Sequence, residues 1–168
     1  AAVANGLAVG GEEWNELNSK INDVELQIAQ ANTAIIEGTN NISKSYVDAF
    51  DNVSQNFGNM ISIIEHQKNM IEEDIAQSEA QGWLVSKEYY NALASNEREN
   101  IAKLQEEKAA LLSQLETTMV NGGIEKGSQA WHDMIAEIDS VTLAIEQGET
   151  ALLEYAQAMQ QIEWEQFD

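Results

Sequence analysis

Apolar side chains recur every three or four residues along most of this chain, a spacing that predicts long α-helices. In the first part of the chain the steps alternate between four and three residues, as in a coiled-coil seam with about 3.5 residues per turn. These positions are Leu17, Ile21, Val24, Ile28, Ala31, Ile35 and Ile42, and the series resumes at Val53, Phe57, Met60, Ile64 and Ile71. Residues 12–81 are therefore expected to form one helix.

One stretch of this first helix departs from the regular spacing. The steps from Ile42 to Tyr46 and from Tyr46 to Phe50 are both four residues long. Such a stutter unwinds a coiled coil locally without ending its helix. Gly58 follows in the helix interior, where glycine costs about 1 kcal/mol relative to alanine. Residues 46–59 are therefore the candidate position for a kink.

Two glycine-containing segments predict the turns between helices. Gln81-Gly82 ends the first helix, and the second turn lies within residues 121–128. Ser86 is expected to cap the N-terminus of a second helix, residues 86–121. A third helix is expected over residues 128–167. Trp83, beside the first turn, is expected to pack over the end of the hairpin core.

The first and third helices resemble each other in sequence. Without gaps and at a shift of 117 residues, residues 14–51 match residues 131–168 at 11 of 38 positions. Any two heptad helices align at apolar positions, which accounts for the Ile and Val matches. The other matches favour a true internal repeat. The full set is Trp14/Trp131, Ile21/Ile138, Val24/Val141, Leu26/Leu143, Ile28/Ile145, Gln30/Gln147, Thr33/Thr150, Ala34/Ala151, Glu37/Glu154, Phe50/Phe167 and Asp51/Asp168.

A repeat of about 117 residues predicts an all-α arrangement of long antiparallel helices, either a coiled coil or a three-helix scheme like that of spectrin repeats. One bundle would contain about 46–81, 86–121 and 127–162, and residues 11–45 would belong to the preceding bundle. The chain, residues 1–168, is interpreted as a single helical fragment of a longer protein. An apolar stripe without its partners is expected to self-associate through residues 11–45. The packing and partner seam comprises Trp14, Leu17, Ile21, Val24, Ile28, Ile35, Trp131, Ile138, Val141, Ile145 and Leu152.

Composition narrows the functional classes. The chain has 29 acidic and 8 basic residues, a formal net charge of -21, and neither Pro nor Cys. So acidic a chain is not expected to bind nucleic acid directly, because phosphates are bound by Lys and Arg. For the same reason, this fragment is not expected to bind anionic membranes. The missing prolines favour uninterrupted helices, and no disulfide chemistry is available.

No arrangement of residues indicates catalysis or a bound cofactor. The only histidines, His66 and His132, each neighbour an acidic residue in sequence, but adjacent residues point to different helix faces. A di-metal helical bundle needs Glu-x-x-His motifs, and Ile63 and Gln129 stand where those glutamates would be. We therefore expect no catalytic, cofactor-binding or metal-binding residues, and we do not expect an enzyme.

Several segments resemble the tail tape-measure proteins of bacteriophages and prophages of Gram-positive bacteria. The first two are residues 83–93, WLVSKEYYNAL, and residues 106–111, EEKAAL. The clearest likeness runs from Gly127-Ser128-Gln129-Ala130-Trp131 through residues 138–145, IDSVTLAI, to residues 164–168, WEQFD. The resemblance covers about 14–51 and 80–168.

The resemblance implies a structural rod that helps to determine tail length and to assemble the tail. The implied partners are the tail tube and other tail proteins, and the implied location is the virion, after synthesis in the bacterial host cytoplasm. The helical region of this family has no catalytic residues to carry over. A non-viral bacterial coiled-coil adaptor or scaffold protein fits the composition and the seams equally well and stays the alternative.

Overall fold

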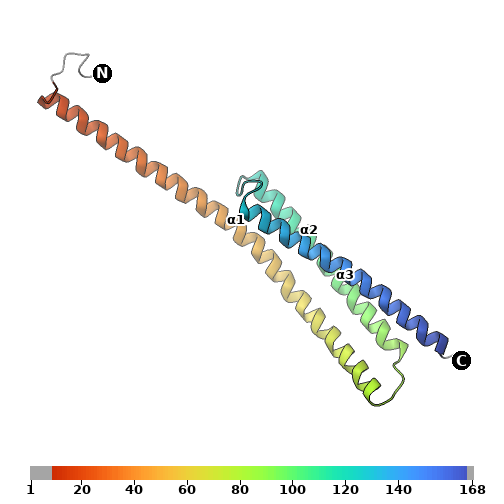
Figure 1. Cartoon of the computed structure of the whole chain (residues 1–168). Coiled ribbons are helices and arrows are strands. Elements are labelled where there is room, and N and C mark those ends of the chain that lie inside the picture. Colours follow the sequence, from red (N-terminus) through yellow and green to blue (C-terminus); the bar gives the residue numbers. More distant parts are fainter. Residues whose placement is uncertain (1–8, 166–168) are drawn as a thin grey trace. The chain divides into compact units, whose positions relative to one another are not determined.

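The computed structural model describes residues 9–165 and contains three α-helices in that range (Figure 1). Helix α1 spans Glu12–Ala80, α2 spans Lys87–Val120 and α3 spans Gln129–Glu165. No strand occurs within the described range, so the prediction of an all-α fold with long antiparallel helices is confirmed. Residues 166–168, including the predicted end of the third helix and the Phe167 and Asp168 matches, lie outside the described residues.

Local side-chain chemistry accounts for the helix ends. The Ser86 Oγ accepts the backbone N–H of Glu88 at 3.2 Å, which confirms the predicted N-cap of α2. Helix α2 ends at Val120 with Asn121 as its C-cap, and Gly122 then adopts a φ of 67°, a left-handed conformation that glycine tolerates best. The Ser128 Oγ accepts the backbone N–H of Trp131 at 3.3 Å at the start of α3. Each end therefore satisfies backbone groups that the helix leaves unpaired.

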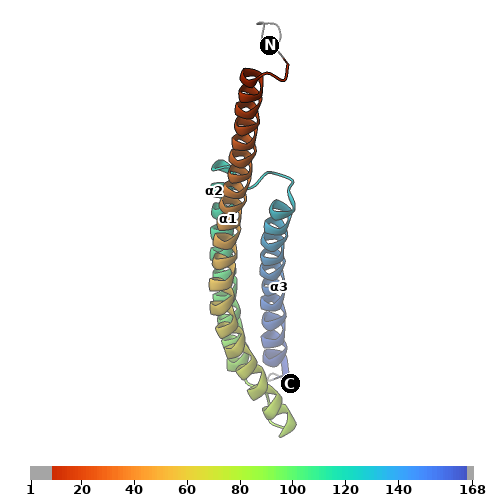
Figure 2. The ribbon, with the colours of Figure 1, turned by 90° about the vertical axis from the view of Figure 1, so that its left-hand side faces the viewer.

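The chain divides into two compact units between Lys44 and Ser45, inside helix α1. The helix itself is uninterrupted from Glu12 to Ala80, and it remains helical through the candidate kink at 46–59. In the second unit, residues 45–80 of α1 pack antiparallel to α2, and α2 packs antiparallel to α3 (Figure 2). The core of this unit comprises Phe50, Leu104, Leu111, Leu115, Ile124, Met134, Ile138 and Val141.

Two glycines let the chain approach itself closely in the second unit. A Cβ on Gly123 would lie 2.2 Å from Cδ2 of Tyr46, so any side chain there would displace the tyrosine ring or the turn after α2. A Cβ on Gly148 would lie 2.8 Å from Cγ1 of Ile101, where α3 crosses α2. The close contacts of α1 with the turn after α2, and of α3 with α2, thus depend on missing side chains.

The first unit contains no buried residue among those the structure describes. All three buried residues of α1, which are Phe50, Ile64 and Ser78, follow Lys44 in the chain. The sequence led us to expect Trp83 to pack over the end of the hairpin core. In the structure Trp83 is 66% exposed and does not cover that core. The turn that carries it lies beyond the last helical residue of α1, which leaves the indole largely in solvent.

Candidate interaction surface

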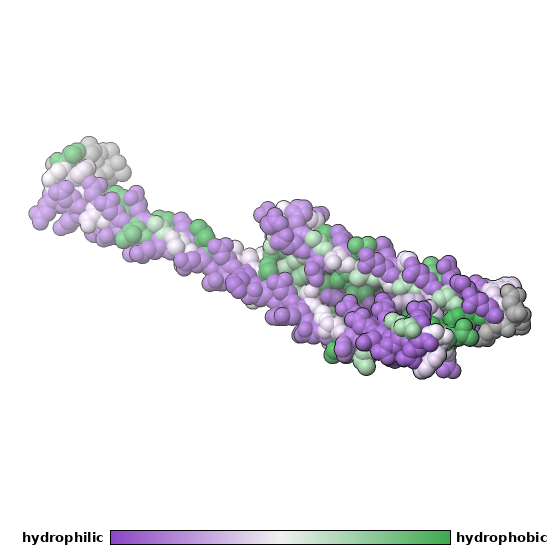
Figure 3. Space-filling view, turned by 60° about the horizontal axis from the view of Figure 1, so that its bottom comes forward, coloured by the Kyte–Doolittle hydropathy of each residue, from purple (hydrophilic) through white to green (hydrophobic). Residues whose placement is uncertain are grey.

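The N-terminal part of the predicted seam lies on the solvent-facing surface of residues 12–44 (Figure 3). Trp14 is half-buried, and the next apolar positions, Leu17, Ile21, Val24, Ile28 and Ile35, range from 38% to 65% exposed. Helical spacing places these side chains on one face. They therefore form a continuous apolar stripe that nothing in its own unit covers, which we call the N-terminal seam.

The C-terminal part of the predicted seam lies in the interior of the second unit. Ile138 and Val141 are each 5% exposed and belong to its core. Trp131 and Ile145 are half-buried and pack against that core, and Leu152 is half-buried. The structure thus separates the eleven predicted seam residues into an exposed group on α1 and a packed group on α3.

The 117-residue alignment compares these two groups position by position. Ile21 is 47% exposed, whereas Ile138 at the matching position is 5% exposed. Apolar residues outside the seam behave differently: Leu26 and Leu143 are both exposed, at 58% and 54%. The difference in burial is therefore confined to the face that α3 turns toward its neighbours. The N-terminal seam has the chemistry of a helix face that is buried elsewhere in this same chain.

Charges are sparse along the second half of the N-terminal seam. Between Leu26 and Ser43, Glu37 is the only charged residue. Lys20 lies before this stretch, beside Ile21, and its ammonium group forms no ion pair within residues 9–165. The acidic residues near the seam therefore lie along its first half, at Glu16, Asp23 and Glu25, and not along its second half.

A buried ion pair links α1 and α2 in the second unit. The Lys68 Nζ lies 3.3 Å from the Glu97 Oε2, and Asn100 donates its Nδ2–H to the Glu97 Oε1 at 3.3 Å. Desolvation is the largest single effect on Lys68 and lowers its pKa, but the Glu97 carboxylate and Tyr155 together outweigh it, so the pKa of Lys68 is raised. Burial raises the pKa of Tyr155 on α3, which lies in the same cluster.

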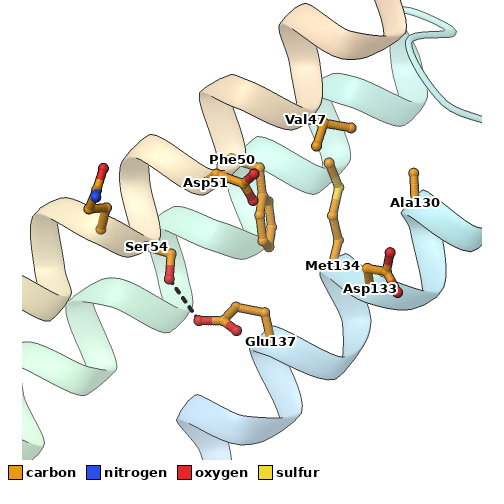
Figure 4. Close-up of a pocket in the computed structure, with 9 residues that line it drawn as sticks. Val47, Phe50, Asp51, Ser54, Ala130, Asp133, Met134 and Glu137 are labelled. Atoms are coloured by element: carbon orange, nitrogen blue, oxygen red, sulfur yellow. Dashed lines mark hydrogen bonds between the residues drawn. The ribbon is translucent and has the colours of Figure 1, made fainter.

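A second polar contact is a hydrogen bond between two residues that line a pocket between α1 and α3 (Figure 4). Ser54 on α1 donates its Oγ–H to the Glu137 Oε1 on α3 at 2.7 Å. The pocket, of about 500 Å³, is also lined by Phe50 and Met134, whose side chains approach each other beside this hydrogen bond. Glu107 on α2 is 4% exposed, and burial together with the charge of Glu137 raises the pKa of its carboxyl.

The apolar pattern did not predict these buried and half-buried charges, although they lie at seam spacings. Lys68 lies four residues after Ile64, Glu97 four after Leu93, and Glu107 three after Leu104. A charged residue at an apolar seam position is the signal that marks a buried polar contact. Only the packing shows that these positions are buried or half-buried and which charges face one another.

Within residues 9–165, no group of three His, Asp or Glu side chains is arranged to hold a metal ion, and His66 and His132 are both exposed. None of the described helices combines the length and apolar character needed to cross a membrane. Comparison with protein families, with curated proteins and with solved structures finds no match to this chain.

Proposed function

We propose that this chain is a structural helical rod segment of a phage tail tape-measure protein, which contributes to tail length determination and tail assembly. The observation that carries the proposal is that α1 is one uninterrupted helix of 69 residues within which one compact unit ends and the next begins. A helix shared by successive units relates the number of residues to distance along a rod. The segments that resemble tape-measure proteins in sequence are the reason why we assign this rod to a phage tail.

The finer arrangement that we propose is a spectrin-like series of three-helix bundles with a repeat of about 117 residues. Residues 11–45 would be the last helix of one bundle, and 46–81, 86–121 and 127–162 would form the next. The boundary between Lys44 and Ser45 supports this division. The matched seam supports it too, because the face that α3 buries is the face that residues 12–44 expose.

We also propose partners and a location for this chain. The isolated chain self-associates through the 11–45 seam, because its exposed apolar side chains gain free energy when they leave water. In the particle, its partners are the tail tube and other tail proteins, and its location is the virion. The chain carries no enzymatic activity in this role.

Changing the number of repeats tests the length function directly. Deletion of residues 14–130 from the gene removes one 117-residue repeat and preserves the helical register. Tails should shorten by about 50 Å if the bundles stay folded, and by up to about 175 Å if the repeat lies in the tail as one extended helix. Electron microscopy of purified particles measures the change. Tails of unchanged length would reject the tape-measure role and favour the adaptor or scaffold function.

A further inference from the structure

The second unit shows how a helix resembling residues 14–35 can be covered. There, α2 and residues 45–80 of α1 form an antiparallel hairpin, and α3 packs Met134, Ile138 and Val141 against it. The matching residues on the N-terminal seam are Leu17, Ile21 and Val24, which are identical or close in size. A groove that accepts these three side chains of α3 therefore has the apolar character to accept the matching side chains of the seam.

One matched pair differs in charge, at a place where the hairpin carries a buried acid. The charge of Glu137 on α3 reaches Glu107 of the hairpin and raises the pKa of its carboxyl, and residue 20, the matching position 117 residues earlier, is a lysine. The Glu107 carboxylate has no hydrogen bond or ion pair within residues 9–165, and its side chain is almost fully buried. Two carboxylates side by side repel each other, whereas a lysine in place of Glu137 would attract Glu107.

We propose that residues 14–35 dock on a second copy of this chain's own hairpin, residues 45–120, with Lys20 paired to the Glu107 carboxylate and the Ser54 hydroxyl of that copy. This inference rests on the proposed repeat, and it names the partner of the seam. The docked helix takes the place that α3 occupies in its own unit, so it docks on a hairpin whose α3 has left the groove. The hairpin prefers this helix electrostatically, because the like-charged contact of Glu107 with Glu137 becomes an opposite-charged one.

The match between the seam and α3 covers only part of the two helices. Ala31 matches Gly148, where a Cβ would lie 2.7 Å from the Glu97 Oε1 and 2.8 Å from the Ile101 Cγ1, so both side chains must shift to admit the alanine. Gly38 matches Tyr155 and has no side chain to fill its place. The favourable contacts therefore end near Ile35, which is why the docking segment stops there.

The test supplies the missing hairpin within the full chain. A second copy of residues 45–127 is inserted between Gly10 and Gly11, which preserves the 117-residue spacing and retains every original residue. Because the natural chain has no cysteine, Ile21→Cys provides a unique thiol on the seam, and Leu26→Cys provides a matched thiol on the outer face. Thiol labelling is measured at a dilution where sedimentation shows both chain forms to be monomeric.

The expected result follows from the matched exposures of 47% for Ile21 and 5% for Ile138. Labelling of the Ile21→Cys thiol should slow about tenfold when the hairpin is inserted, and labelling of the Leu26→Cys thiol should not change. Equal labelling of Ile21→Cys in both chain forms overturns the proposal. A seam that pairs with its twin in a two-stranded coiled coil would instead give rapid Ile21→Cys disulfide dimers with and without the insertion, and this too overturns it.

A charge variant tests the proposed ion pair separately from folding of the added hairpin. Lys20→Glu should lower the midpoint of thermal unfolding in the inserted chain and leave it unchanged in the natural chain, whereas Lys20→Arg should preserve it in both. An equal effect in both chains, or none in either, contradicts the Lys20 to Glu107 contact. The tail-length measurement does not depend on these outcomes, so failure of the docking and failure of the tape-measure role are distinguishable.

Discussion

The ion pair between Lys68 and Glu97 offers the sharpest test of how the second unit is held together. Lys68→Met keeps the length and most of the apolar volume of the side chain but removes the ammonium group. The Glu97 carboxylate, on a side chain only 4% exposed, then retains Asn100 as its remaining hydrogen-bond donor. Leaving a buried carboxylate without its counter-charge costs more than the pair contributes when intact.

The structure sets the size of the expected loss. Charges 3.3 Å apart attract by about 5 kcal/mol at an effective dielectric constant of about 20. The Lys68 side chain is 29% exposed, so water screens part of this attraction. We therefore expect Lys68→Met to lower the free energy of unfolding by about 2–3 kcal/mol, less than the about 3–5 kcal/mol typical of a fully buried pair.

The assay is urea unfolding followed by circular dichroism, with the same substitution at Lys103 as the control. Lys103 pairs with Glu106 on the surface of α2, where the two side chains are 32% and 56% exposed. Lys103→Met should therefore cost less than about 0.5 kcal/mol. Equal losses for the two variants would refute the reasoning, as would a Lys68→Met, Glu97→Leu double variant no more stable than Lys68→Met alone.

The pH dependence of this difference has a defined sign. Because the pKa of Lys68 is raised above its ordinary 10.5 in the folded chain, its contribution is fully present below pH 10.5. The contribution disappears as the pH rises through the folded-state pKa, where the ammonium group loses its proton. The stability difference between the natural chain and Lys68→Met should accordingly shrink in strongly alkaline solution.

The remaining predictions concern a buried acid, a close approach and the exposed seam. Glu107→Gln should stabilise the chain at pH 7, because a raised pKa means that the ionised Glu107 carboxylate destabilises the folded state. This gain in stability should vanish below the ordinary pKa of 4.5, and urea unfolding at several pH values measures it. Gly123→Ala should destabilise the second unit by at least about 1 kcal/mol, measured by thermal unfolding, because the new methyl overlaps the ring of Tyr46. The natural chain should form dimers or larger assemblies in sedimentation as its concentration rises, and Ile21→Ser should weaken this association while Leu26→Ser does not. A monomer at every concentration would count against the seam.

The hydrophobic pattern was informative wherever a helix could be recognised from local spacing. The three/four spacing, the absence of proline and the Ser86 cap predicted a protein of long helices, and the structure confirms that class. These signals are legible in sequence because they arise from neighbours within about one turn of the same helix. Trp83 shows the limit of this approach, since its exposure depends on how far the turn reaches beyond the hairpin core.

The sequence by itself determined the helical class and the existence of two similar apolar faces, at Ile21 and at Ile138. Only the tertiary structure decided that the face on α3 is buried while that on residues 12–44 is exposed. It also decided that Lys68 faces Glu97 and that the charge of Glu137 reaches Glu107. The physical reason is that periodicity shows which side chains share a face, whereas burial and charge pairing depend on contacts between residues far apart in the chain.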